Sequence, residues 1–264
     1  MQIEVITFYN YDISKVIGNF AAKFFDYMNW LERTRLLIGD EGVWKLQKKH
    51  VLVVGLGGVG AYAAEQICRA GVGEMTIVDG DLLHHSNINR QLPALSSTVG
   101  KPKAFVLGER LLDINPNLNL HVIREYIRDE RMREILLEKY DYIVDAIDTL
   151  SPKVFLIVDS IKHGHKLVSS MGSGGKIDPS QVHVSDISKT KICPLARILR
   201  KRLHRFNIRS GFKAVYSTEK VPEHAMVPCE GEPNKKTTIG TISYMPPLFG
   251  CIMASVVVRD LLKE

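Results

Sequence analysis

A run of apolar residues that ends in a cluster of glycines constrains the fold of this chain more than any other feature. Residues 50–55 read HVLVVG, and the loop that follows, GLGGVG at 55–60, leads into a helix-like stretch at 59–70. A continuous apolar run of this length is typical of a parallel strand that is buried on both faces. Glycines between such a strand and a helix let phosphate groups approach the backbone amides at the helix N-terminus. The pattern therefore predicts a parallel α/β sheet with a phosphate-binding loop.

Strand-like and helix-like segments alternate along the chain, which favours a parallel, doubly wound sheet. Further strands are predicted at 75–81, 120–127, 140–148 and 166–172, and helices at 32–46 (one helix or two short ones), 103–114 and 152–163. Beyond Gly175 the pattern changes to strands at 181–187 and 214–221, a basic helix, a polar loop at 223–236 and a closing helix at 249–262. A strand at 3–8 and a helix at 13–28 precede this pattern. We predict an α/β fold with a Rossmann-like doubly wound, mostly parallel sheet and a C-terminal extension of antiparallel strands and helices.

Composition places the chain among ordinary globular proteins. It has 264 residues, of which 45% are hydrophobic and 24% charged. The four cysteines form no C-x-x-C pair, which excludes a zinc ribbon and suits a reducing compartment. The longest apolar stretch covers 11 residues, 248–258, whereas a membrane span needs about 20. The N-terminus lacks the early Lys or Arg of a secretory signal. We therefore expect a cytoplasmic protein with no membrane partner.

The positive charge of the chain is concentrated in one segment. The net charge is +6, yet nine basic residues and no acidic ones lie between Lys189 and Lys213, so the rest of the chain is net acidic. The sequence PLARILRKRLHRF at 194–206 predicts an amphipathic helix with a basic face. Such a face is either an ordinary solvated surface or a contact for nucleic acid or an acidic protein. The residues that would contact RNA are Arg197, Arg200, Lys201, Arg202 and Arg205.

Charged residues follow the predicted strands, at the edge where open α/β sheets bind ligands. Asp79 ends the second strand and is placed to bind ribose hydroxyls, while Asp145 and Asp148 come at the end of the fourth. Arg90 and Lys103 add two cations. A dehydrogenase needs few cations here, whereas an enzyme that cleaves a triphosphate needs cations on the phosphates and carboxylates on Mg²⁺. Each of these residues taken alone fits a surface position or a helix cap. Taken together, they favour an enzyme that cleaves a triphosphate.

These residues resemble a known family. Gly55–Gly60, Asp79, Asn87, Arg90, Lys103 and Asp148 resemble the ATP-binding motif of the ThiF/MoeB/HesA superfamily of adenylating enzymes, which also includes ubiquitin-activating enzymes. The segment ERTRLLIG at 32–39 looks like that family's short N-terminal element, in which an arginine reaches the triphosphate held by the partner subunit of a homodimer. Arg33 is the matching residue. The resemblance implies a ThiF-type adenylating domain at 29–264 with a substrate-facing part at 181–264, and residues 1–28 form an extension of unknown role.

The resemblance implies a role for each of these residues. The catalytic residues would be Arg33, Arg90, Lys103 and Asp148, with Asp148 also the ligand of Mg²⁺. The ATP-binding residues would be Gly55, Gly57, Gly58, Gly60, Asp79, Asp81, Asn87, Arg90, Lys103 and Asp145. A monovalent cation, K⁺ or Na⁺, is a further expected cofactor.

The second half of the chain indicates which group of enzymes within this superfamily the protein resembles. Segments 170–179, 186–190, 194–197 and 216–219 resemble the tRNA threonylcarbamoyladenosine dehydratases, which use ATP to cyclise threonylcarbamoyladenosine beside the anticodon. This implies dehydration through an adenylated carboxylate, with tRNA as partner. Some members carry a cysteine before the final glycine-rich segment; here the nearest is Cys229, so no thioester cysteine is expected.

Two other functions stay open. One is adenylation of the C-terminus of a small ubiquitin-like sulfur-carrier protein, with a sulfur-transfer protein as a partner. The basic helix argues against it, because such a tail needs an apolar groove. The other is a nucleotide-binding regulator without turnover, which would have no use for Arg33, Arg90, Lys103 and Asp148 together.

Overall fold

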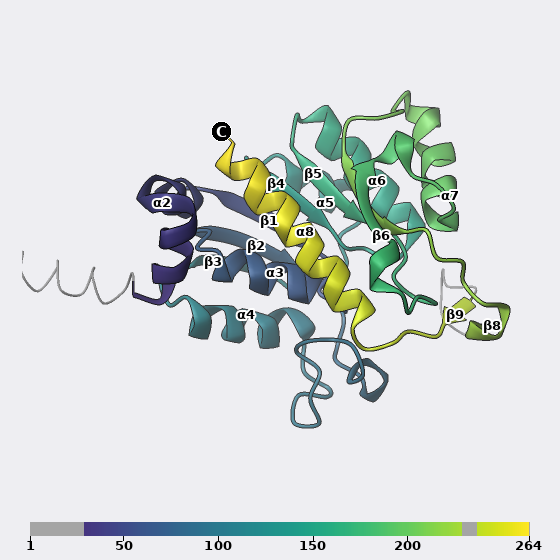
Figure 1. Ribbon diagram of the computed structural model, residues 1–264, viewed down its shortest axis with the longest axis horizontal. Helices are drawn as coiled ribbons and strands as arrows, with labels where there is room; N and C mark the ends of the chain where they lie inside the picture. The colour runs from purple at the N-terminus through teal and green to yellow at the C-terminus, as the bar shows by residue number, and fades with distance from the viewer. Residues whose placement is uncertain (1–28, 229–236, 264) are drawn as a thin grey trace, which may run out of the picture.

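The computed structural model describes residues 29–228 and 237–263, and Figure 1 shows one large sheet with helices on both faces. The strands are β1 His50–Val54, β2 Glu74–Val78, β3 Asn119–Ile123, β4 Tyr142–Asp145, β5 Leu167–Ser170, β6 Val182–Asp186, β7 Lys213–Ser217, β8 Met226–Pro228 and β9 Thr237–Ile239. The α-helices are α2 Glu32–Gln47, α3 Gly60–Arg69, α4 Lys103–Ile114, α5 Asp129–Leu136, α6 Leu150–Lys162, α7 Pro194–Leu203 and α8 Met245–Leu262. Short 3-10 helices are η1 Asn29–Leu31, η2 His85–Asn87, η3 Pro179–Gln181, η4 Ile187–Lys189, η5 His204–Phe206 and η6 Glu223–Ala225. The strand and helix expected at 3–8 and 13–28 lie outside the described residues.

The strand order defines where a ligand can bind. The main sheet has the order β3-β2-β1-β4-β5-β7-β6, with every neighbouring pair parallel except β6 and β7. From β1 the chain builds outward to β2 and β3, and it then returns to the other side of β1 with β4. At such a switch point the loops after the two strands diverge and leave a crevice at their carboxyl ends. The predicted doubly wound, mostly parallel fold is confirmed.

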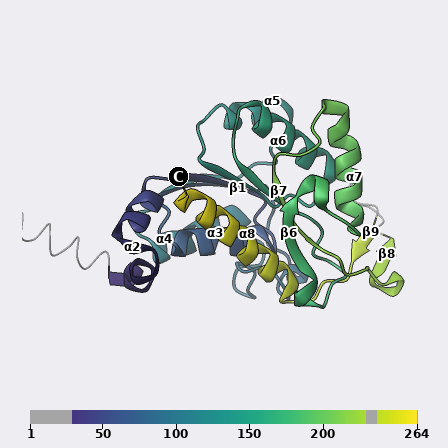
Figure 2. The same ribbon diagram turned by 45° about the horizontal axis from the view of Figure 1, so that its top comes forward.

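Side chains alternate between two apolar layers, one on each face of the sheet. On β1, Val51 and Val53 pack against α3, α4 and α8, whereas Leu52 and Val54 pack against α5, α6 and α7. Figure 2 shows these two groups of helices on opposite sides of the sheet. Because both faces are covered, all five residues of β1 are buried, which explains why residues 51–54 are apolar without alternation.

The C-terminal part belongs to the same core. β7 pairs with β5, and β6 completes the sheet on its outer edge. α8 packs closely on α3, since a Cβ on Gly250 would lie 2.4 Å from the carbonyl oxygen of Val59. α8 is also long and apolar enough to cross a membrane, but half of it is buried in the fold, including Phe249, Met253 and Val257. Its position as a core helix accounts for the apolar sequence.

Several elements differ from the sequence-based prediction, and strands expected at 120–127 and 214–221 end earlier, at Ile123 and Ser217. The segment expected to be a loop at 223–236 contains β8, which pairs with β9; all three β8 residues are exposed, so they carry no apolar alternation. Helix α5 was not predicted, because DERMREIL is mostly charged and only three of its eight residues are buried. The fourth strand, expected at 140–148, spans Tyr142–Asp145, and the Asp145 side chain then accepts a hydrogen bond from the backbone N–H of Ile147.

Candidate nucleotide-binding site

The loop after β1 folds back on itself and presses against the segment that follows β4. Gly55 has a left-handed φ of 88°, and a Cβ there would lie 2.8 Å from the carbonyl oxygen of Ala146. A Cβ on Gly60 would lie 1.7 Å from the carbonyl oxygen of Gly55. Both positions therefore require glycine. At Gly57, by contrast, the nearest atom to such a Cβ is the Gln91 amide nitrogen at 3.6 Å, so the middle of the loop is open to a ligand.

Asp79 holds the loop in place from the end of β2. One carboxylate oxygen accepts a hydrogen bond from the N–H of Leu56 at 2.7 Å, and the other accepts one from the N–H of Asp81 at 2.8 Å. Burial raises the pKa of Asp79, although nearby Lys103 and these two hydrogen bonds act in the opposite direction. Asp79 thus lies beside the glycine loop, as expected, and it organises the backbone there.

Lys103, Asp81 and Tyr126 form a compact charged group next to the loop. Lys103 begins α4 and is only 5% exposed, yet its ammonium donates to Asp81 at 2.7 Å. The Tyr126 hydroxyl donates to the other oxygen of Asp81. Burial alone would raise the pKa of Asp81, but the hydrogen bonds from Lys103 and Tyr126 outweigh it and hold that pKa below its usual value. The hydrogen bond to Asp81 also raises the pKa of Tyr126 to about 12.

Arg90 and Asp148 carry opposite charges that interact through space. The Arg90 guanidinium donates to the carbonyl oxygen of Ser86 at 2.7 Å and to the side chain of Asn89 at 2.8 Å. Burial lowers the pKa of Arg90, and the negative charge of Asp148 partly offsets this. Asp148 itself is exposed, in the loop after β4. A Cβ on Gly58 would lie 3.2 Å from the carbonyl oxygen of Arg90, which places the glycine loop against the same segment.

Two buried amides lie in the segment around η2. Asn87 accepts a hydrogen bond from the N–H of His84 at 3.0 Å and so closes the turn that carries Arg90. Gln91 is 8% exposed and lies against Gly57. Its side-chain oxygen has no hydrogen-bond partner in the part of the chain that the structure describes. A buried acceptor without a donor is costly. The atom of Gln91 that faces Gly57 is the amide nitrogen, so the unpaired oxygen is directed away from that glycine.

Asp145 is buried, whereas Asp148, the other carboxylate predicted at the end of the fourth strand, is exposed. The Asp145 side chain is 0% exposed and accepts hydrogen bonds from Lys153 at 2.7 Å and from Ser169 at 2.6 Å. Lys153 is 0% exposed as well, so the two form an ion pair inside the protein. The structure gives Asp145 these internal partners, and its expected contact with ATP stays a prediction.

Arg33 lies at the other end of the sheet from the glycine loop. Leu31 packs on Gly71, and the N–H of Gly73 donates to the carbonyl oxygen of Leu46 at 3.2 Å, so α2 sits where β1 and β2 begin. The glycine loop follows the opposite, carboxyl end of β1. Arg33 is exposed and is not brought to the crevice of its own chain. Its expected contact with the ATP of a partner subunit stays a prediction.

The basic helix forms as predicted. Ala196, Leu199 and Leu203 of α7 are buried against the sheet layer. Arg200 is half-buried and donates to the carbonyl oxygen of Thr190 at 3.0 Å and to the Thr190 hydroxyl. The other four predicted RNA contacts have exposed side chains: Arg197, Lys201, Arg202 and Arg205.

Three residues of this region were not predicted from the sequence to belong to the site. Tyr126 follows β3 and binds Asp81, 45 residues earlier in the chain, and Lys153 lies on α6 and binds Asp145 at the end of β4. Gln91 directly follows Arg90, and its only sequence signal is that position. Their importance depends on burial and on contacts between distant segments, which a single sequence does not show.

The fold and the crevice define a nucleotide-binding α/β protein of the adenylating type, and comparison with known proteins identifies its family. The ThiF family matches residues 31–264. The chain therefore belongs to the ThiF family.

Individual relatives cover nearly the whole chain. The tRNA threonylcarbamoyladenosine dehydratase of Bacillus subtilis is 35% identical over 244 residues, which are 90% of this chain and 96% of that protein. The crystal structure of the Escherichia coli tRNA N6-threonylcarbamoyladenosine dehydratase TcdA in complex with ATP matches with a TM-score of 0.82 and 31% identity, covering 89% of this chain and 95% of that one. TcdA in complex with AMP matches with a TM-score of 0.78. The Escherichia coli sulfur carrier protein ThiS adenylyltransferase is 28% identical over 157 residues, 58% of this chain and 61% of that protein.

Proposed function

We propose that this protein is an ATP-dependent tRNA threonylcarbamoyladenosine dehydratase. The observation that carries the proposal is the carboxyl edge of the sheet at the β1–β4 switch point, where the glycine loop lies against Asp79 and Arg90. Lys103 adds a second positive charge beside Asp79, and the exposed carboxylate of Asp148 lies in the field of Arg90. The match of nearly the whole chain to dehydratases of this name supports the substrate. The complexes of TcdA with ATP and AMP support the nucleotide.

ATP would bind with its phosphates against Gly55–Gly60 and its ribose near Asp79. Lys103 and Arg90 would neutralise the polyphosphate, and Asp81 keeps the Lys103 ammonium positioned at 2.7 Å. Asp148, exposed and within the electrostatic field of Arg90, is the residue proposed to hold Mg²⁺. Mg²⁺ would supply charge neutralisation on the phosphates. A monovalent cation, K⁺ or Na⁺, rests on the family resemblance alone, and no residue is assigned to it.

The reaction would need two displacements. The carboxylate of the threonyl group on the modified adenosine attacks the α-phosphorus of ATP, and pyrophosphate leaves. A nitrogen or oxygen of the carbamoyl group then attacks the activated carbonyl carbon and loses its proton. The bond to AMP breaks and AMP carries away the former carboxylate oxygen, so one water is formally removed. Both steps depend mainly on charge stabilisation and positioning, which the cations of the crevice provide.

The proposal includes a homodimer and a cytoplasmic location. Arg33 lies on α2, away from the crevice of its own chain, and the neighbouring Leu36 and Leu37 are 80% and 85% exposed. Apolar side chains this exposed are typical of a surface that packs against another subunit. The tRNA would lie on the basic face of α7, within the substrate-facing part at 181–264. A sulfur-transfer partner is suggested only by the sulfur-carrier relatives in the family.

A defined reaction tests this function. Purified protein is incubated with Mg-ATP and tRNA that carries threonylcarbamoyladenosine, and the nucleosides are analysed by mass spectrometry. We expect the modified nucleoside to lose one water in step with AMP formation. Asp148→Ala is expected to reduce the rate at least about 100-fold, the usual cost of a lost electrostatic contact at a transition state. Because Asp148 is exposed, the variant should unfold at the same temperature as the wild type.

Two results would contradict the proposal. The first is a wild-type protein that leaves the tRNA nucleoside unchanged but exchanges pyrophosphate into ATP when a sulfur-carrier protein is added. That outcome would identify the adenylyltransferase alternative. The second is an Asp148→Ala rate within threefold of the wild type, which would remove Asp148 from the site.

A further inference from the structure

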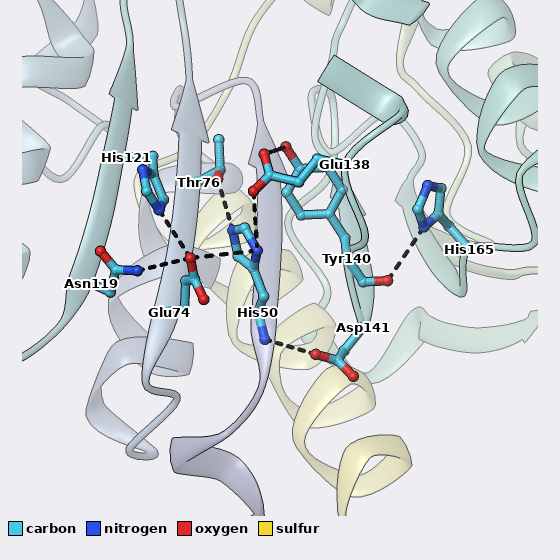
Figure 3. Close-up of polar contacts among 9 residues, drawn as sticks. All are labelled: His50, Glu74, Thr76, Asn119, His121, Glu138, Tyr140, Asp141 and His165. Atoms are coloured by element: carbon cyan, nitrogen blue, oxygen red, sulfur yellow. Dashed lines mark hydrogen bonds and ion pairs between the residues drawn. The ribbon is translucent and has the colours of Figure 1, made fainter. Parts of the chain in front are cut away.

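A second cluster of ligand-type side chains lies at the amino end of the sheet, opposite the nucleotide crevice. His50 begins β1, Glu74 begins β2, and His121 lies in β3. In the sheet register His50 is level with Glu74, and His121 is level with Thr76. Figure 3 shows the three side chains side by side across neighbouring strands. They take no part in the proposed reaction.

The three side chains already converge on one point. Glu74 Oε1 lies 2.9 Å from His121 Nε2 and 3.8 Å from His50 Nδ1. One ligand atom from each residue lies within 4.8 Å of the other two. In a tetrahedral zinc site, with bonds of about 2.0–2.1 Å, the ligand atoms are roughly 3.3 Å apart. Small side-chain rotations would therefore bring these atoms to the required spacing.

Neighbouring groups prepare His50 as a ligand. Its Nε2 lies 2.9 Å from the Thr76 hydroxyl, and a donor N–H at Nε2 would leave Nδ1 with its lone pair directed at Glu74. Metal-binding histidines usually have such a partner on the second ring nitrogen, which fixes the ring and its tautomer. His50 is also packed edge-on against Tyr140, with ring centroids 4.7 Å apart.

A further carboxylate, in the segment before β4, lies near His50 but outside the group of three that converge. Glu138 Oε1 lies 3.9 Å from His50 Nδ1, and its other oxygen accepts a hydrogen bond from the Tyr140 hydroxyl at 3.1 Å. Asp141, by contrast, is engaged elsewhere, since it accepts hydrogen bonds from the N–H of His50 and from Lys49. Asn119 donates to Glu74 at 2.8 Å and steadies that carboxylate.

We propose that His50, Glu74 and His121, with Glu138 as fourth ligand, form a binding site for Zn²⁺ or a similar divalent transition-metal ion. Two neutral imidazoles and two carboxylates balance the charge of such an ion, and this mixture of nitrogen and oxygen ligands suits zinc better than Mg²⁺ or Ca²⁺. The bound ion would join β1, β2 and β3 to the segment before β4. Since it lies at the opposite end of the strands from the glycine loop, its role would be to stabilise the fold rather than to take part in catalysis.

Zinc binding to the full chain tests this site. Metal-free protein, prepared with a chelator that is then removed, is titrated with ZnCl₂ in equilibrium dialysis without ATP. We expect one ion per chain to bind and to raise the melting temperature, because a ligand that binds only the folded state stabilises it. Cobalt(II) at the same site should give the visible absorption of a four-coordinate ion. His121→Ala and Glu74→Gln should each weaken zinc binding at least about tenfold.

Controls separate this site from adventitious binding. His204→Ala removes an exposed histidine on η5 and should bind zinc as the wild type does. Thr76→Val keeps the shape of the strand but removes the partner of His50, and we expect about 10- to 100-fold weaker binding. Melting of each metal-free variant shows whether it folds. Equal zinc affinity and stoichiometry in the wild type, His121→Ala and Glu74→Gln would overturn the proposal, whatever the outcome of the dehydratase assay.

Discussion

At the scale of single residues, neighbouring aspartates of the crevice have separate roles that their sequence positions do not reveal. Asp148 is exposed and faces the charge of Arg90, whereas Asp145, three residues earlier, is fully buried against Lys153. The sequence predicts that both lie at the end of the fourth strand. Which of them points into the protein depends on Lys153 and Ser169, on two other elements.

Lys153→Met should destabilise the protein strongly. It leaves the Asp145 carboxylate buried without its counter-ion, and breaking a buried ion pair in this way costs about 3–5 kcal/mol of unfolding free energy. Urea denaturation measures the loss. The matched double variant Asp145→Leu with Lys153→Met removes both charges and should recover most of it, since an apolar replacement of a buried pair is often neutral. A single variant that loses under about 1 kcal/mol would show that the pair is unimportant for folding.

At the scale of elements, α7 combines a buried face with a basic one. Leu199 and Leu203 hold it against the sheet layer, which directs Lys201, Arg202 and Arg205 into solvent. Arg200 is the exception, because its guanidinium binds Thr190 and fastens the turn before the helix. A test of RNA binding should therefore leave Arg200 in place.

We expect the triple variant Lys201→Gln, Arg202→Gln and Arg205→Gln to bind tRNA more weakly and with less dependence on salt. Each lost phosphate contact lowers the slope of log affinity against log salt by roughly 0.7–0.9, so the slope should fall by about two to three. Glutamine retains good helix propensity. Filter binding over a salt series measures the slope, and ATP affinity should be unchanged.

The control for this experiment removes the same charge elsewhere. Lys139, Lys162 and Lys263 are exposed in other parts of the chain, and their change to Gln should leave the slope as in the wild type. If the slope of log affinity against log salt falls equally in the two triple variants, tRNA binding depends on the net charge of the protein and α7 is not the binding surface.

At the scale of the whole molecule, the arrangement of α2 leaves one proposed catalytic residue without a site in its own chain. Gly39 interrupts α2 with a φ of 76°, so the helix is two short segments, one of the two forms expected from its sequence. The first segment carries Arg33 and the exposed Leu36 and Leu37 at the amino end of the strands. A two-fold dimer through this surface would present Arg33 to another subunit.

Mixing two inactive variants tests that arrangement. Arg33→Ala and Asp148→Ala homodimers should both be inactive. After random exchange half of the dimers are mixed, and each mixed dimer has one intact site out of two, so about a quarter of the wild-type activity should return. The dehydratase assay measures the recovery, and labelled subunits verify the exchange. Verified exchange without recovery would place Arg33 outside the partner's site.

The sequence alone determined the alternation of strands and helices in the parallel part of the sheet and the position of the phosphate loop. The buried strand β1 and the glycines after it carry strong local signals, because a strand covered on both faces must be apolar and a turn with a left-handed φ favours glycine. The helix at 103–114 matches α4 residue for residue, since its apolar spacing and the Asn115-Pro116 stop are also local.

The tertiary structure alone decided which polar groups meet and which are buried. The Asp145–Lys153 pair, the contact of Tyr126 with Asp81 and the unsatisfied oxygen of Gln91 arise when separate elements pack, and no periodicity within one element encodes them. The same holds for His50, Glu74 and His121, which lie in three separate segments of the chain and become neighbours only through parallel strand pairing. Because hydrogen bonding and desolvation depend on distance in space, the chemistry of these groups became visible only in the folded molecule.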